Sequence, residues 1–101
     1  MSHDARQVRE IQAAIRKVLL HRWDPIGVAG VPQAADEYDG YVGPVYRLLS
    51  SHATDRQLAE YLADIQANAM ELDDPGWRSL LPVAHELQKL FAESNSTPPA
   101  T

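Results

Sequence analysis

The stretch WDPIGVAGVPQAADEYDGYVGPVY, from Trp23 to Tyr46, divides this chain into two parts. It contains one of the two tryptophans, three of the four tyrosines and four of the five glycines. The segments on either side carry the regular apolar spacing of amphipathic helices. The stretch therefore predicts a connection between helices in which aromatic and acidic side chains are concentrated.

The residues before this stretch have the pattern of one helix, from about Asp4 to Arg22. Its apolar positions are Val8, Ile11, Ile15, Val18 and Leu19. These positions share one helix face, which we expect to meet the core. The helix should end near Trp23, because Asp24 precedes Pro25 and a residue before proline is displaced from helical backbone angles. The glycines and prolines that follow predict a loop to about Ala35, of a length typical of functional or disordered segments.

A second, shorter helix follows the acidic part of the stretch. Its apolar positions are Val42, Val45, Tyr46 and Leu49. Pro44 has no N–H, so we expect the helix to begin between Tyr41 and Gly43, where that donor would be unpaired in any case. The alternative is an earlier start near Asp39, with a kink. Either start places the preceding carboxylates where the helix macrodipole favours negative charge.

Two more helices are predicted in the second half of the chain. Thr54 and Gln57 form a capping-box motif, which opens a helix that runs to about Ala69. The last helix has Ser79 as its candidate N-cap residue. The small polar residues and prolines over 95–101 predict a disordered C-terminal tail.

The bulk composition fits one small helical domain. The chain has 101 residues, of which 45% are hydrophobic and 23% charged, as in ordinary globular proteins. No segment shows the alternation of apolar and polar residues that is typical of a half-buried strand. We therefore predict an all-α fold: one helical domain over residues 1–94, built as a small four-helix bundle with a long ordered loop between its first two helices.

Cysteine content, hydropathy and charge exclude several classes of protein. The chain has no cysteine, which excludes disulfide frameworks, thiolate zinc sites and cysteine nucleophiles. It has no secretory signal pattern and no run of about 18 apolar residues, so we expect a cytoplasmic protein without a membrane span. The net charge of −5 argues against nucleic acid and anionic membranes as partners, and is compatible with a basic protein partner.

The motifs WDPIGV and DEYDGYVGPVYRLL resemble those of a family of small bacterial proteins, catalogued as a domain of unknown function. That family is similar in carrying W-D-P-x-G, then D-E-Y-D, then helical segments. The resemblance covers roughly Leu19 to Met70. It implies an α-helical fold, and some relatives look like immunity or toxin-neutralising proteins.

The carboxylates Asp36, Glu37 and Asp39, together with Asp24, form the acidic part of a candidate site. Hard cations such as Mg²⁺ and Ca²⁺ prefer carboxylate oxygens, so a metal site is one reading of this group. The spacing does not match an EF-hand loop. The plainer reading is that these residues cap the second helix and form a turn after the first, where Asp24 accepts hydrogen bonds from backbone N–H groups.

Four aromatic residues accompany these carboxylates. We expect Trp23 and Tyr46 to lie in the core and to tie the long loop to the bundle. Tyr38 and Tyr41 lie nearer the acidic residues and are the candidates for exposed anchors, because tyrosine offers a rigid apolar surface with a polar end. The candidate partner-binding set is therefore Asp36, Glu37, Tyr38, Asp39 and Tyr41.

No pattern in the chain indicates a catalytic centre or a cofactor site. The histidines form no H-E-x-x-H motif, and the glycines match neither a P-loop nor a dinucleotide fingerprint. The leading hypothesis is an interaction module that binds a basic protein partner through the acidic and aromatic loop, as an inhibitor or immunity protein would. The alternative is a small metal-dependent enzyme or metal-binding protein that uses the same carboxylates. A third hypothesis is a homo-oligomer, in which apolar helix faces complete a shared core.

Overall fold

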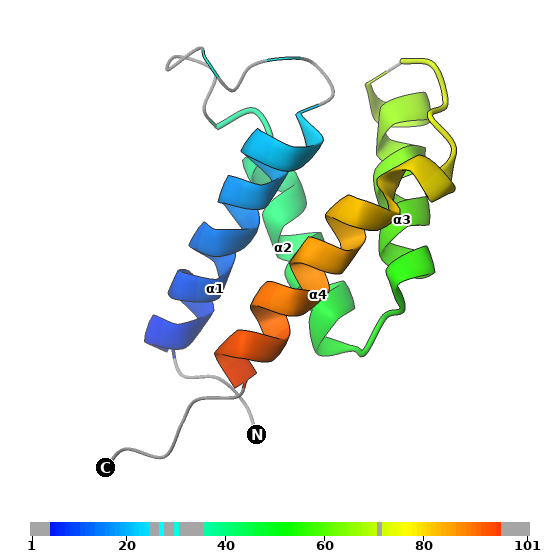
Figure 1. Ribbon diagram of the computed structural model, residues 1–101. Coiled ribbons are helices and arrows are strands. Elements are labelled where there is room, and N and C mark those ends of the chain that lie inside the picture. The colour runs from blue at the N-terminus through cyan, green and yellow to red at the C-terminus, as the bar shows by residue number, and fades with distance from the viewer. Residues whose placement is uncertain (1–4, 25–26, 28–29, 31–35, 71, 96–101) are drawn as a thin grey trace.

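The structure is a computed structural model that describes residues 5–24, 27, 30, 36–70 and 72–95. It contains four α-helices, which run up and down beside one another (Figure 1). Their bounds are Ala5–Val18 for α1, Asp39–Ser50 for α2, Asp55–Asp64 for α3 and Leu81–Asn95 for α4. The described residues include no strand, and the predicted all-α four-helix fold is confirmed. None of the described helices combines the length and apolar character that crossing a membrane requires.

The helix α4 lies at the centre of the bundle. It packs against α1 on one side and α3 on the other, and it also contacts α2, while α1 packs against α2. Figure 1 shows α4 between α1 and α3, with α2 behind it. The helices α2 and α3 follow each other in the chain but make few contacts with each other. In this arrangement, one side of α2 and one side of α3 are not packed tightly against each other.

The core is made of the apolar stripes that the sequence predicts. In α1, Ile11 and Ile15 are buried, and in α3, Leu58 and Leu62 are buried. The fully buried residues with the largest side chains are Tyr38, Ile15, Leu19, Leu49, Leu58, Leu62, Leu87 and Val45. Because every helix contributes to this set or to its margins, removing any one helix exposes the apolar faces of the others.

The first helix ends where the sequence predicts, but its last turn has an unexpected form. A π-helical turn, Leu19–Trp23, continues α1 to the tryptophan. Asp24 then adopts a left-handed conformation, with φ of 32°, and its N–H donates to the Leu19 carbonyl over 2.9 Å. This bond closes the wide turn, and Trp23 is held at the end of the buried stripe of α1 with 7% of its surface exposed.

The second helix begins at Asp39, so the expected start between Tyr41 and Gly43 is wrong and the alternative start is confirmed. Pro44 therefore lies inside α2, where its missing N–H leaves the Gly40 carbonyl without its helical donor. Gly40 is exposed, so water can reach that carbonyl. This access to water explains why the helix tolerates a proline in its second turn.

The third helix begins as predicted, with a complete capping box. The Gln57 N–H donates to Thr54 Oγ1 over 3.1 Å, and the Thr54 N–H donates to Gln57 Oε1 over 2.8 Å. A second π-helical turn, Ile65–Ala69, continues α3 to the predicted end. Two helices of this bundle thus end in π-helical turns, and Figure 1 places both ends at the same end of the molecule.

The prediction that Ser79 caps the last helix is wrong. Ser79 lies inside a short 3₁₀ turn, Trp77–Leu80, which precedes α4. Its hydroxyl donates to the carbonyls of Pro75 and Gly76, over 2.9 and 2.8 Å, so it closes this turn and does not cap α4. Gly76 has φ of 76°, a backbone conformation that glycine adopts without strain.

Two sequence predictions concern segments outside the described residues. The long ordered loop between the first two helices falls largely on 25–26, 28–29 and 31–35, and the C-terminal tail on 96–101. Asn95, the first residue of the predicted tail, is the last residue of α4.

Candidate functional site

The five predicted site residues lie in the turn before α2 and in its first turn. Asp36, Glu37 and Asp39 are exposed, Tyr41 is half-buried and Tyr38 is buried. They are close together along the chain, but their side chains reach different environments. Three of the carboxylates therefore remain candidates for contact with a partner, while the two tyrosines separate into different roles.

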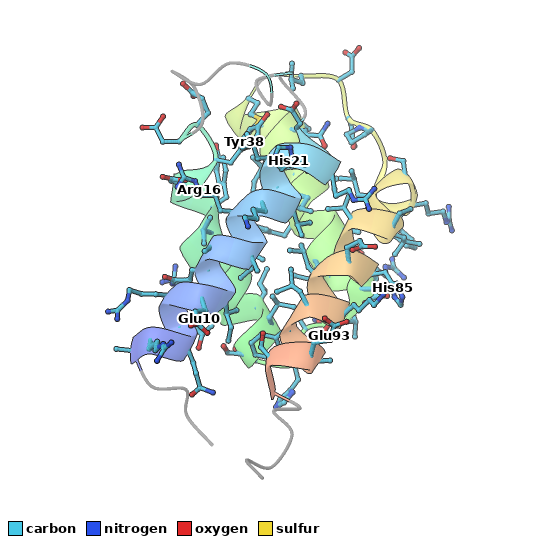
Figure 2. All side chains as sticks on the ribbon, turned by 60° about the vertical axis from the view of Figure 1, so that its left-hand side comes forward. Glu10, Arg16, His21, Tyr38, His85 and Glu93 are labelled. Atoms are coloured by element: carbon cyan, nitrogen blue, oxygen red, sulfur yellow. The ribbon has the colours of Figure 1, made fainter. Side chains whose placement is uncertain are left out.

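Tyr38 is part of the core, and the prediction that it is an exposed anchor is wrong. It is 1% exposed, and its ring lies 5.3 Å from the ring of Trp23. Its hydroxyl donates to Asp24 Oδ1 over 2.7 Å. The ring can be buried because this carboxylate accepts the hydrogen bond that the hydroxyl would otherwise lose with water. Figure 2 shows Tyr38 at the end of the bundle to which α1 leads.

Trp23 occupies the core, as the sequence predicts, and joins three segments of the chain. Its indole N–H donates to Gln66 Oε1 over 2.7 Å, and Gln66 belongs to the π-helical turn after α3. The edge of Tyr41 meets the Trp23 ring at a centroid distance of 6.0 Å and an angle of 83°. Sequence reasoning missed Gln66, because an uncharged polar residue near the end of an amphipathic helix carries no signal of a partner 43 residues away.

Asp39 is tied to α1 by an ion pair. Its Oδ1 lies 2.9 Å from Nε of Arg16, and both side chains are close to half exposed, at 48% and 45%. As predicted, Asp39 lies in the first turn of α2, where the macrodipole favours negative charge. The two residues line a shallow hollow of about 390 Å³ between α1 and α2. Arg16 therefore compensates the charge of this carboxylate before any partner arrives.

Asp36 and Glu37 differ from Asp39 in their lack of an ion-pair partner among the described residues. Both are exposed, and within the described part of the chain neither carboxylate forms an ion pair. The backbone around them is fixed, since the Asp39 N–H donates to the Asp36 carbonyl over 3.1 Å. Two uncompensated carboxylates thus stand on an ordered turn at the start of α2.

A second tyrosine, Tyr61 of α3, lies near Tyr41 of α2. Burial raises the pKa of the Tyr61 hydroxyl, and the neighbouring Tyr41 and Asp64 raise it further, while Arg47 lowers it. The charges that act on Tyr61 thus come from both α2 and α3. Tyr61 was not among the predicted site residues, because its position beside the core face of α3 is also typical of a packing residue.

The described residues do not support the metal site of the alternative hypothesis. Among them, no group of three histidine, aspartate or glutamate side chains is placed to hold an ion. Asp24, which that site required, points to the hydroxyl of Tyr38. Three histidines, His21, His52 and His85, are exposed. Of these, His85 lies 3.6 Å from a carboxylate oxygen of Asp55, far along the chain from the acidic turn.

No family model, curated protein or solved structure matches this chain. The resemblance to the W-D-P-x-G and D-E-Y-D family therefore stays a prediction.

Proposed function

We propose that this protein is an interaction module that binds a protein partner with a basic surface. The observation that carries the proposal is the contrast between carboxylates at the start of α2. Asp39 is neutralised by Arg16 at 2.9 Å, whereas the exposed Asp36 and Glu37 have no ion pair among the described residues. Uncompensated charges of one sign attract a partner of the opposite sign and speed its association.

The base on which these carboxylates stand is rigid. Behind them, Tyr38 is buried against Trp23 and bonded to Asp24, so the turn cannot shift without breaking buried contacts. A rigid site loses less conformational entropy on binding than a mobile one. The buried Tyr38 thus holds the turn in place, while the exposed carboxylates of Asp36 and Glu37 are free to contact the partner.

Tyr41 is the aromatic residue that remains available for contact with a partner. It is half-buried, and its ring lies 6.0 Å from the ring of Trp23, nearly perpendicular to it. A tyrosine fixed in this way offers apolar area at a small cost in side-chain entropy. The partner-binding set that we propose is therefore Asp36, Glu37 and Tyr41, with Asp39 positioned by its ion pair.

An inhibitor- or immunity-like role is the version of this proposal that agrees with the resemblance of the WDPIGV and DEYD motifs. Proteins of that kind neutralise a partner by occupying its surface, and acidic side chains suit a partner that is itself basic. The net charge of −5 for the whole chain supports the same polarity.

The test is affinity capture from a lysate of the source cell, with identification of the retained proteins by mass spectrometry. The test variant carries Asp36→Asn and Glu37→Gln. The matched control carries Glu10→Gln and Glu93→Gln, which remove the same charge at the opposite end of the bundle from Tyr38 (Figure 2). We expect the wild type and the control to retain a basic partner that the test variant loses, and its affinity to fall as salt rises.

Two results would contradict the proposal. One is a partner that the test variant retains as well as the wild type does. The other is an affinity for the identified partner that is the same at low and high ionic strength, since charges at exposed sites are screened by salt.

A further inference from the structure

A groove beside the turn between α2 and α3 is a surface hollow that the proposed binding residues do not line. These helices are joined through a short turn and make few mutual contacts. The hollow between them measures about 600 Å³. Its lining consists of Leu48, Ser51, Ala53, Gln57, Glu60, Tyr61 and Asp64.

Leu48 is the residue of α2 in the lining of this groove, and it is apolar. Tyr41 and Pro44 precede it by seven and four residues, so they form one stripe with it along the helix, although they are not part of the lining. This stripe is separate from the fully buried Val45 and Leu49, which face the core. All three residues of the stripe are half-buried. The apolar surface thus runs from the proposed binding residue Tyr41 down to the turn before α3.

The wall that α3 presents is acidic, with one aromatic ring. Glu60, Tyr61 and Asp64 line it, and the lining of the groove includes no lysine, arginine or histidine. Oε1 of Glu60 lies 2.6 Å from Nε of Arg56, so the two side chains form an ion pair. The Arg56 guanidinium also lies over the ring of Trp77, and neither Arg56 nor Trp77 lines the groove. Asp64 accepts a hydrogen bond from Asn68, which leaves its negative charge uncompensated.

We propose that this groove holds an amphipathic helix of the partner, with an apolar stripe against Leu48 and Tyr61 and a lysine or arginine facing Asp64. The inference rests on the proposed function, because it assigns the same basic partner a second point of contact. Charge complementarity selects the occupant: one apolar wall and one acidic wall match a helix that is apolar on one side and basic on the next.

The groove also continues the surface already proposed. Tyr41 connects the two, since it follows Asp36 and Glu37 in the chain and lies on the same side of α2 as Leu48, which lines the groove. A partner helix in the groove would therefore end beside the two exposed carboxylates, where further basic residues are favoured.

The experiment uses a displayed library of random peptides of about 16 residues, long enough for four helical turns. The library is selected on the wild-type protein, and single peptides are then synthesised and measured by fluorescence anisotropy. Two variants probe the groove: Leu48→Glu changes the apolar wall, and Asp64→Lys reverses the charge of the acidic wall. Asp64 is exposed, so its variant keeps the fold even if Leu48→Glu does not. Glu93→Gln is the control.

We expect the selected peptides to carry basic residues and to have apolar residues three and four apart. Their affinity should fall by about tenfold or more in Leu48→Glu and in Asp64→Lys, and stay within about twofold in Glu93→Gln. The proposal is overturned by a selection without enrichment, by peptides that lack basic residues, or by binding that neither groove variant changes.

Three further outcomes are distinguishable from these. If the wild type sediments as a dimer that Leu48→Glu dissociates, the occupant is a second copy of this chain and the proposal is wrong. If the captured partner is lost with Asp36→Asn and Glu37→Gln but kept by both groove variants, the interaction module stands and the groove does not belong to it. If the groove binds its peptides while the carboxylate variant keeps every partner, the proposed function falls and the groove remains.

Discussion

The two tryptophans of this protein lie in contrasting regions. Trp23 is 7% exposed, its N–H donates to Gln66 over 2.7 Å, and the rings of Tyr38 and Tyr41 lie 5.3 and 6.0 Å from its own. Trp77 is half-buried at the start of a 3₁₀ turn. The guanidinium groups of Arg56 and Arg78 lie 4.7 and 4.9 Å from its ring.

The difference shows that the same type of side chain can either connect distant segments in the core or pack on the surface with charged neighbours. Trp23 joins the end of α1 to the turn before α2 and to the end of α3, so its contacts close one end of the bundle. Trp77 joins neighbouring surface positions of α3 and the 3₁₀ turn through exposed cations. An exposed cation–π contact contributes about 0.5–1 kcal/mol, whereas a buried aromatic side chain contributes several times more.

The sharpest test of this contrast is Trp23→Ala. We expect it to lower the free energy of unfolding by about 3–5 kcal/mol, because it removes a large buried ring and leaves the Gln66 amide without its donor. Urea unfolding followed by circular dichroism measures the change. A loss below about 1 kcal/mol would mean that Trp23 does not close the end of the bundle.

The next test is Tyr38→Phe, which keeps the buried ring and removes the hydroxyl that donates to Asp24. We expect a loss of about 1–3 kcal/mol, because a partly buried carboxylate loses a hydrogen-bond donor. A double-mutant cycle with Asp24→Asn isolates the energy of the pair. If the two changes are additive, the bond does not contribute to the rigid base of the acidic turn.

Trp77→Ala should have a smaller effect, about 1–2 kcal/mol, because the ring is half-buried and its charged neighbours remain hydrated without it. Fluorescence adds an independent readout. In Trp77→Phe the remaining emission comes from Trp23, and iodide should quench it less than it quenches the emission of Trp23→Phe. Equal quenching in the two variants would remove the distinction between a buried and a surface tryptophan.

The smallest effect concerns Tyr61, which is half-buried like Trp77. Its pKa is raised above 10.0 in the folded protein, first by burial, so the folded state favours the neutral hydroxyl. The contribution of this preference to stability is complete below pH 10 and is lost as the pH rises through the higher folded pKa. Thermal midpoints between about pH 9 and 11 should fall more steeply in the wild type than in Tyr61→Phe. Parallel curves would contradict this assignment.

Local sequence patterns were enough to predict the helices and most of their inner faces. The apolar stripes of α1 and α3, the capping box at Thr54 and the burial of Trp23 all depend on spacings of a few residues. Patterns that extend over only a few residues reflect the geometry of one helix, so they can be read without knowing which helices pack against it. The same range of reasoning failed at Ser79, because a hydroxyl that closes a 3₁₀ turn looks the same in sequence as one that caps a helix.

The site was predictable only in part, because its geometry depends on contacts between distant residues. The exposure of Asp36 and Glu37 follows from their polarity, but the burial of Tyr38 depends on Asp24, 14 residues earlier. The neutralisation of Asp39 depends on Arg16 of another helix. The groove between α2 and α3 follows from the packing of both helices on other partners, which no motif within either helix encodes.

The central position of α4 has a consequence for the order in which the protein can be assembled. A ribosome produces α1, α2 and α3 before α4, and domains generally fold as units once their residues have emerged. Until residues 81–95 leave the exit tunnel, the apolar stripes of α1 and α3 have no common helix to cover them. The pairing of α1 with α4 also joins segments from opposite ends of the chain, which adds loop-closure entropy to the folding barrier. The nascent chain is therefore most open to chaperones and proteases immediately before its last helix appears.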